Sequence, residues 1–317
     1  AYNADLVAKT TKAFKDNFGS FGFAFAQVEA RPEIDRTTNR VALVMQAEPS
    51  RRAYVRKVNV AGNSRTRDEV IRREFRQLES SWYDGDKIKL SRDRVDRLGF
   101  FKEVNVETQD VAGSPDQVDV QVNVEEKSSG SIQLGAGFSS ADKLSLSFSI
   151  KQENAFGSGN YLGLEVNTSK FNQVVVVSTV DPYFTDGGIS RSIDIFHRAT
   201  KPYNDQGGNS ELVTQGAGLR VGVPFSELAT VYFGGSLERT TIKPGTNIPA
   251  AYLAYAEEFG YTSMAVPLTI GWSRDDRDST LAPRTGVYQR LKTEAGMFGD
   301  AHYLRTNYQY QHYVPVI

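Results

Sequence analysis

The fold class is indicated most clearly by two neighbouring segments, Ser131-Ile-Gln-Leu-Gly-Ala-Gly-Phe138 and, after a short turn, Leu144-Ser-Leu-Ser-Phe-Ser-Ile-Lys151. In both stretches every second residue is apolar, and the residues between are polar or glycine. Such an alternation is typical of a β-strand with one apolar and one polar face. It recurs along the rest of the chain and predicts ten strands, at residues 131–138, 144–151, 162–167, 173–180, 189–197, 213–223, 230–240, 264–273, 287–295 and 303–314.

The length of these strands favours a membrane barrel over a soluble sandwich. Strands of soluble sandwiches have about five or six residues. At about 3.3 Å per residue and a tilt of about 40°, a strand of about ten residues rises about 25 Å, the height of the apolar band of an outer-membrane barrel. The other face carries Ser, Gln, Gly, Glu, Asn and Lys, which suit a water-filled interior better than a dry core. We predict an antiparallel transmembrane β-barrel and keep a soluble all-β domain as the alternative.

Composition changes near residues 125–130. Only six of the 27 glycines precede residue 127, and the density of charged residues roughly halves after it. The N-terminal part mixes the helical period with the strand period. Helices are expected at residues 5–18, 67–77 and 86–98, and strands at residues 23–29, 40–47, 54–60, 100–108 and 118–124.

This N-terminal part resembles two copies of one α+β unit. A shift of 77 residues places Gly22-Phe23 on Gly99-Phe100, and the alternating residues 41–47 on residues 118–124. The strands between them match poorly, so we expect a bulge or a one-residue slip there. A small sheet of this kind has exposed edges, which can accept a strand of another chain through backbone hydrogen bonds.

The composition excludes several classes of function. The net charge of −1 gives no basic excess for binding nucleic acid. Cys is absent and the three His residues lie far apart, so neither a disulfide scaffold nor a metal motif is expected. Asp275-Asp-Arg-Asp278 is an acidic turn without the spacing of a calcium loop, and the glycines at 216, 218 and 222 lie within a strand rather than a nucleotide-binding turn. No catalytic residue, cofactor or metal is predicted.

Four blocks, in order, resemble the last POTRA domain of the Omp85 outer-membrane assembly proteins. They are Tyr54-Val-Arg-Lys-Val-Asn-Val-Ala-Gly-Asn63, Arg72-Arg-Glu-Phe-Arg-Gln77, Arg97-Leu-Gly-Phe-Phe101 and Gly113-Ser-Pro-Asp-Gln-Val-Asp-Val120. Asp181-Pro-Tyr-Phe184 resembles a barrel turn of the family, and the segment 275–286 resembles a later strand–loop–strand segment. The resemblance implies a partial, fourth-like POTRA domain at 1–49, a fifth-like one at 52–126, and about ten strands of a 16-stranded barrel at 130–317. Because the Arg-Gly-Phe motif of the sixth extracellular loop and the final strand are missing, we expect a fragment of a longer protein.

The family resemblance also implies a function and a location. We expect a non-enzymatic protein of the bacterial outer membrane, with POTRA domains in the periplasm, that assembles and inserts other barrel proteins. Its partners are then unfolded outer-membrane protein clients, assembly lipoproteins and outer-membrane lipid. The alternative is a pore for two-partner secretion or another Omp85-type translocation pore.

Two sets of site residues follow. Val70, Ile71 and Phe75 form the apolar side of the helix expected at 67–77, which leaves its charged side free. The resemblance implies that this side docks a lipoprotein, and the alternative is a solvated face; the predicted contact residues are Arg73, Glu74 and Arg76.

The first barrel strand is the second set. Glycine weakens a strand and lets another backbone approach, and the resemblance implies that this strand pairs with the final one and forms a lateral gate. The alternative is that small residues merely make room inside the barrel. The predicted gate residues are Ser131, Ile132, Gln133, Leu134, Gly135, Ala136, Gly137 and Phe138.

Overall fold

The computed structural model describes residues 3–37, 40–140, 143–201, 209–278, 283–300 and 302–315. The chain divides into two compact units, Ala1–Ser129 and Gly130–Ile317.

The first unit begins with a helix and a hairpin. Helix α1 (Ala4–Ser20) starts at Asn3, whose side chain accepts hydrogen bonds from the first free backbone N–H groups of the helix. Strands β1 (Gln27–Asp35) and β2 (Arg40–Glu48) pair antiparallel, and α1 packs against β1. The strand expected at 23–29 thus begins later and passes through Pro32, which a strand with an open edge tolerates.

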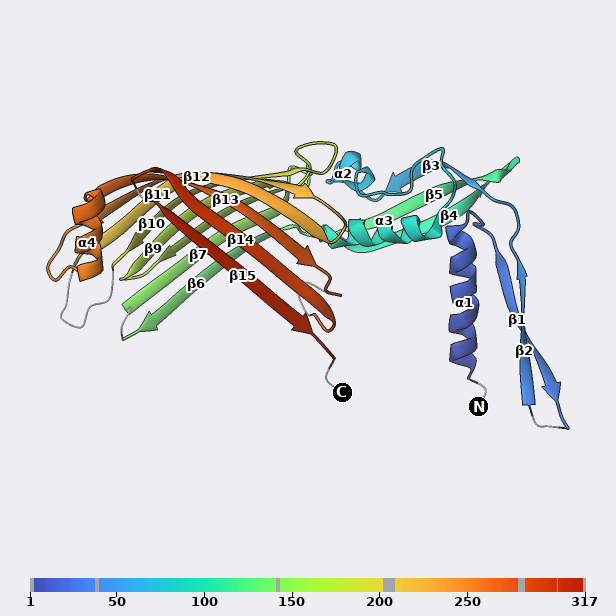
Figure 1. Ribbon diagram of the computed structural model, residues 1–317. Helices are drawn as coiled ribbons and strands as arrows, with labels where there is room; N and C mark the ends of the chain where they lie inside the picture. Colours follow the sequence, from blue (N-terminus) through green and yellow to red (C-terminus); the bar gives the residue numbers. More distant parts are fainter. Residues whose placement is uncertain are drawn as a thin grey trace. The chain divides into compact units, whose positions relative to one another are not determined.

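The rest of this unit is a complete α+β module (Figure 1). Its elements are β3 (Tyr54–Ala61), α2 (Asp68–Arg72), α3 (Gly85–Arg97), β4 (Phe101–Val111) and β5 (Ser114–Glu126). The central strand β5 pairs parallel with β3 and antiparallel with β4. The alternating valines of β5 are buried, and they share one hydrophobic core with apolar residues of both helices: Val118, Val120, Val122, Val124, Val70, Ile71, Ile88 and Val95.

The internal repeat is visible in the backbone. Gly22 follows α1 with φ +95°, and Gly99 follows α3 with φ +75°, a conformation that glycine adopts most readily. The two hairpins differ by one residue in register. In the first hairpin Ala30 pairs with Met45, so an exact repeat after 77 residues would pair residue 107 with Val122 in the second hairpin. The observed partner of Val122 is Val106 instead. The expected one-residue slip is confirmed, and the register of β4 on β5 is irregular between Phe101 and Glu103.

The second unit is one antiparallel sheet of ten strands, in which each strand pairs with its neighbours in sequence. All ten predicted strands are present. They are β6 (Gly130–Ser139), β7 (Lys143–Ala155), β8 (Asn160–Thr168), β9 (Asn172–Asp181), β10 (Ser190–Thr200), β11 (Glu211–Pro224), β12 (Ala229–Lys243), β13 (Thr262–Asp275), β14 (Gly286–Gly299) and β15 (Tyr303–Tyr313). In the described residues β6 and β15 each pair on one side only and form the edges of the sheet.

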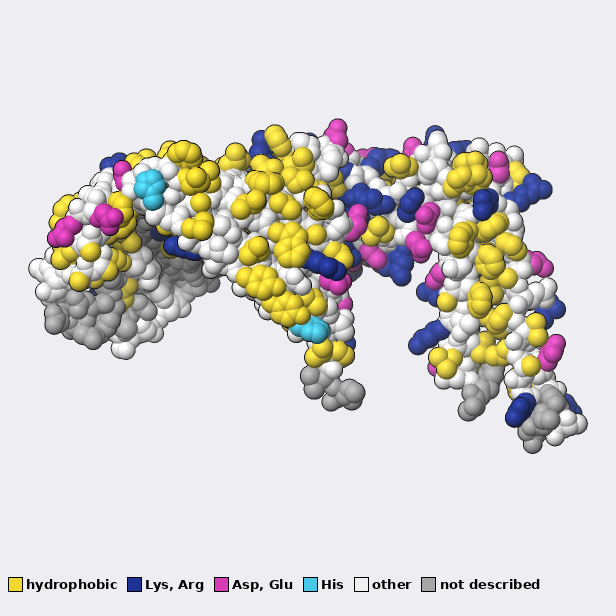
Figure 2. All heavy atoms as spheres, viewed as in Figure 1, with side chains coloured by type: hydrophobic (Ala, Val, Ile, Leu, Met, Phe, Trp, Pro, Cys, Tyr) yellow, Lys and Arg dark blue, Asp and Glu magenta, His cyan; other side chains and the backbone are white. Residues whose placement is uncertain are grey.

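One face of this sheet is apolar and exposed. Leu134, Ile195 and Leu219 are 80%, 58% and 50% exposed, and Figure 2 shows hydrophobic side chains spread over the surface of the sheet that faces the viewer. Helix α4 (Ala250–Phe259), between β12 and β13, was not expected from the sequence; the Tyr255 hydroxyl lies 2.8 Å from the Ser263 hydroxyl of β13. Within the described residues, no helix has the length and hydropathy that crossing a membrane requires.

Candidate functional site

Glu74, the centre of the expected lipoprotein contact, is not on a free surface. Helix α2 ends at Arg72 instead of continuing to residue 77, and the chain then turns. Glu74 is only 5% exposed, and its carboxylate pairs with the Arg94 guanidinium of α3 at 2.7 Å. The expectation of an exposed Glu74 is therefore wrong, because the chain leaves the helical path and turns this side chain into the module.

Arg73 and Arg76 also belong to the turn. Both are half-buried, and the Arg76 guanidinium donates to the Arg73 carbonyl at 3.2 Å. The backbone N–H of Arg76 donates to Ser91 Oγ of α3 at 2.8 Å. The three predicted residues therefore do not form the free charged side of one helix.

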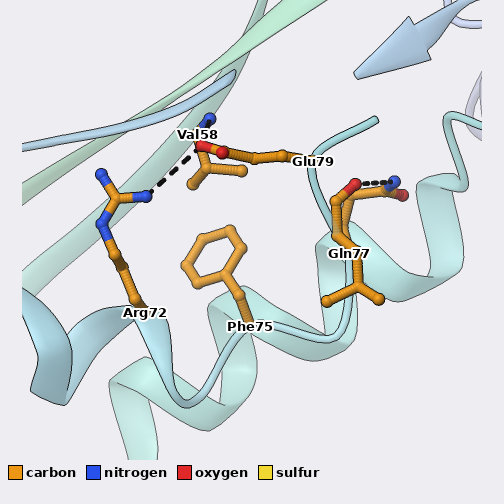
Figure 3. Close-up of a pocket in the computed structure, with 6 residues that line it drawn as sticks. Val58, Arg72, Phe75, Gln77 and Glu79 are labelled. Carbon is orange, nitrogen blue, oxygen red and sulfur yellow. Dashed lines mark hydrogen bonds and ion pairs between the residues drawn. The ribbon is translucent and has the colours of Figure 1, made fainter. Parts of the chain in front are cut away.

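The surface next to this turn has a different composition (Figure 3). A shallow pocket of about 390 Å³ is lined by Val58, Arg72, Phe75, Gln77, Leu78 and Glu79. Leu78 is 67% exposed, and the Glu79 carboxylate accepts from the Val58 backbone N–H at 2.8 Å and pairs with Arg72 at 3.4 Å. Sequence reasoning missed Leu78 and Glu79 because it extended the helix to residue 77 and did not consider the loop.

The outer edge of β3 is largely covered by the same loop. The Val55 N–H donates to the Ser81 carbonyl at 2.9 Å, and the Val55 carbonyl accepts from the Ser80 N–H at 2.7 Å. The Tyr54 ring stacks on Trp82 with centroids 3.8 Å apart. Since β4 pairs only with β5 in the described part of the module, the outer side of β4 is its open edge.

The predicted gate residues 131–138 all lie on β6. This strand pairs with β7 over its whole length, and every residue of it is exposed. Gly135 and Gly137 face the hydroxyl groups of Ser147 and Ser145 and line a shallow pocket of about 410 Å³. The structure therefore brings the predicted gate residues together on one edge strand.

The end of the α+β module holds a half-buried anchor, Glu126, that the sequence did not reveal. The Glu126 carboxylate accepts hydrogen bonds from the backbone N–H of Thr66 at 2.7 Å, the backbone N–H of Arg65 at 3.0 Å and the Ser64 hydroxyl at 2.8 Å. Burial alone would raise the pKa of Glu126, but these donors outweigh it and lower the pKa to about 2. The loop can approach because Gly62 has no Cβ, which would lie 2.0 Å from the Val124 carbonyl oxygen.

In the described residues no three His, Cys, Asp or Glu side chains gather as metal ligands would. Asp275 of the acidic turn pairs with Arg277 at 2.7 Å. The sites described above thus offer backbone edges, an apolar side chain and ion pairs, which are features of binding rather than of catalysis.

Comparison with known families separates the two units. The Omp85 superfamily domain matches residues 154–317, and the POTRA family, described as a surface antigen variable number repeat, matches residues 53–127. The fold class and the expectation of a non-enzymatic protein agree with this assignment.

Known proteins resemble the chain over nearly its full length. It is 33% identical over 94% of its residues to the outer membrane protein assembly factor BamA of Neisseria meningitidis, and 26% identical over 98% to BamA of Nitratidesulfovibrio vulgaris. These matches cover 39% and 38% of the relatives, so the chain spans about two-fifths of their length.

Solved structures show the same fold. The crystal structure of BamA from Haemophilus ducreyi lacking POTRA domains 1–3 matches all of this chain and 62% of that one, with a TM-score of 0.76 and 24% identity. CdiB from Acinetobacter baumannii matches 96% of this chain and 56% of that one, with a TM-score of 0.54 and 12% identity. The chain belongs to the Omp85 superfamily, and it joins a periplasmic POTRA module to part of an outer-membrane β-barrel.

Proposed function

We propose that this chain is part of a factor that assembles and inserts β-barrel proteins into the bacterial outer membrane. The observation that carries the proposal is a POTRA module followed by an antiparallel sheet of long strands with an exposed apolar face. The relatives' description as outer membrane protein assembly factors supports it.

Depletion of the full-length protein tests this function. We expect the amount of folded outer-membrane proteins, measured by heat-modifiable gel mobility, to decrease. Unfolded clients are expected to accumulate in the periplasm. If outer-membrane proteins stay folded while one secreted protein is lost from the medium, the chain is a translocation pore instead. The likeness to CdiB concerns the fold alone and favours neither function.

The open edge of β4 is the proposed place for unfolded clients in the POTRA module. Support comes from the contrast with β3, whose edge is occupied by residues 79–81. A client strand that adds to β4 would gain backbone hydrogen bonds independent of its sequence. A photo-crosslinking residue at Asn105 of β4 is expected to capture clients, whereas one at Lys57 of β3 is the matched control. Equal capture at both positions contradicts a preference for β4.

The lateral gate is proposed at β6, the first strand of the sheet. Pairing with β7 holds β6 on one side, and Gly135 and Gly137 contribute no side chains to that pairing. A strand held in this way can exchange its second partner at low cost. We propose that this edge passes client strands into the membrane.

We propose that the assembly lipoprotein docks at the surface formed by Arg72, Leu78 and Glu79. Leu78 offers exposed apolar area, and the two charged groups flank the pocket (Figure 3). Arg73, Glu74 and Arg76 do not line the pocket; they belong to the turn before Leu78, which the Glu74–Arg94 pair and the Arg76 backbone N–H hold to α3. Their role in docking is then indirect.

A charge reversal separates docking from folding. We expect Glu79→Lys to reduce co-purification of the lipoprotein while the circular dichroism of the POTRA module is kept. Glu69→Lys is the control, since the Glu69 side chain is 67% exposed and lies outside the pocket. Unchanged co-purification with Glu79→Lys excludes this surface.

A further inference from the structure

The exposed apolar face of the ten-stranded sheet is interrupted by three polar side chains. His197 of β10, Gln215 of β11 and Arg239 of β12 are neighbours, because Gln215 pairs with each of the other two in the strand register. The Gln215 side-chain nitrogen lies 3.0 Å from Nδ1 of His197. Two positions away on β10 and β12, Ile195 and Leu237 belong to the exposed apolar face, so the polar side chains share that face. We call His197, Gln215 and Arg239 the polar row.

The polar row lies at the outer end of the apolar face. The sheet is entered from the periplasm, and β12 is its seventh strand, so β12 runs towards the cell exterior. Arg239 lies ten residues after Ala229, the first residue of β12. At about 3.3 Å per residue and a tilt of about 40°, this is a rise of about 25 Å, the height of the apolar band of an outer-membrane barrel. The row is therefore at the level where the headgroups of the outer leaflet begin.

Polar side chains are not a general feature of this end of the face. On the side of the first strands, the apolar face reaches its outer end with Phe138 of β6 and Leu144 of β7, and both are exposed. On the side of the last strands, it does so with Met297 of β14 and Leu304 of β15, which are also exposed. The polar row is thus a local break between two apolar stretches.

The charge of the polar row is positive and unopposed. Arg239 is exposed, and no ion pair or hydrogen bond joins its guanidinium to any residue that the structure describes. The residues that the register places across from it, or one pair further along this face, are neutral: Gln215, Val213, Ala217, Met264 and Thr262. Because β11 and β13 flank β12 on both sides, no further strand of the barrel can cover this position.

Two carboxylates of the same rim are already engaged. Glu211, four residues from Gln215 on β11, pairs with Lys243 at 3.3 Å. Asp300, after β14, accepts a hydrogen bond from the Met264 backbone N–H at 2.8 Å. Neither carboxylate therefore neutralises Arg239.

The groups around Arg239 add hydrogen-bond donors. The amide nitrogen of Gln215 can only donate, so Nδ1 of His197 accepts from it and Nε2 of the neutral ring carries the hydrogen. At the next position of this face, the hydroxyl groups of Thr241 and Thr262 lie 3.5 Å apart. A ligand that accepts hydrogen bonds through several oxygens suits this arrangement.

We propose that the polar row binds the phosphate group of a lipid headgroup in the outer leaflet. A guanidinium pairs with a phosphate through two parallel hydrogen bonds, and the imidazole N–H can donate to a further oxygen. The acyl chains of such a lipid lie beside Ile195 and Leu237, so a lipid gains apolar contacts that a soluble phosphate does not. The inference rests on the outer-membrane location and not on the assembly function.

Binding is tested on the full-length protein in zwitterionic detergent, with lipid A carrying two phosphates as the probe and native mass spectrometry as the readout. We expect one bound lipid A, with binding weakened at least about tenfold in Arg239→Gln, because the lost guanidinium removes charge-assisted hydrogen bonds. Arg274→Gln is the control, since Arg274 is exposed on the same face at the periplasmic end of β13. Heat-modifiable mobility verifies that each variant is folded. Equal weakening in the control, or no lipid A on the wild type, overturns the proposal.

A second arm separates the phosphate from the acyl chains. The wild type is titrated with lipid A from which both phosphates have been removed, and with inorganic pyrophosphate as a competitor. We expect weak binding of the dephosphorylated lipid and little competition by pyrophosphate. Dephosphorylated lipid A that binds as tightly as the phosphorylated form overturns the proposal in favour of apolar contact alone. Pyrophosphate that displaces lipid A at equal concentration overturns it in favour of a soluble phosphate.

Discussion

At the scale of single residues, the Glu126 carboxylate makes the stability of the POTRA module depend on pH. The pKa of Glu126 is lowered from 4.5 to about 2, so its ionised form favours the folded state. The contribution is complete above about pH 4.5 and fades as the pH falls towards 2. We expect Glu126→Gln to lower the free energy of unfolding by about 1–3 kcal/mol at neutral pH.

The measurement is urea unfolding of residues 1–129, which have their own core. The difference in the free energy of unfolding between the wild type and the Glu126→Gln variant is expected to decrease as the pH falls from 5 to 2. A difference that stays constant over this range contradicts the anchoring role of the carboxylate.

The pair of Glu74 and Arg94 leads to a second residue-scale prediction. Glu74→Lys places two positive charges next to each other where the side chains are 6% and 19% exposed. Removing one partner of a buried pair typically costs about 3–5 kcal/mol, so we expect loss of the fold rather than loss of docking alone. Thermal unfolding of residues 1–129 measures this effect, with Glu69→Lys as the exposed control. A melting temperature equal to that of the control contradicts burial of the pair.

At the scale of elements, β6 provides the clearest experiment. In the full-length protein, a Cys at Gln133 and a second Cys opposite it on the final strand are expected to form a disulfide that closes the gate. Insertion of clients then stops under oxidising conditions and resumes after reduction, as measured by heat-modifiable mobility. A Cys pair joining Gln133 to Ser149, its partner on β7, is the control, because that pairing does not have to open. Normal insertion by the locked barrel rules out lateral opening here.

Element boundaries show what local sequence could and could not predict. Helix α3 and all ten barrel strands follow from periodicity, because each buries or exposes one face along its whole length. Helix α2 stops at Arg72 because the segment after it packs as a turn on α3, through contacts such as Arg76 with Ser91 that no local pattern encodes. Helix α4 was missed because apolar residues occur all round it rather than at helical spacing.

At the scale of the whole molecule, the alternation of apolar and polar residues predicted the class of the fold, and the family resemblance predicted the order of the domains. The residues of the lipoprotein contact were predicted less well. Glu74 and Glu79 lie five positions apart in one charged stretch, yet tertiary packing buries the first and leaves the second at the surface. Glu126 is distant in sequence from its donors at 64–66, so its anchoring role could be found only from the folded module.

The number of strands has a consequence for which compartment each loop occupies. Ten antiparallel strands are an even number, so the chain leaves β15 at the same rim of the sheet at which it entered β6. Helix α4 follows the seventh strand, and so lies at the opposite rim. With the POTRA module in the periplasm, residue 314 shares that compartment and α4 is displayed to the medium. Residues 1–317 contain no cysteine, so each single-cysteine variant carries one label in a full-length protein whose remaining sequence is also free of cysteine. We expect a membrane-impermeant maleimide to label Ala254→Cys on intact cells, and Val314→Cys only after the outer membrane is permeabilised; the reverse order would invert the topology of the barrel.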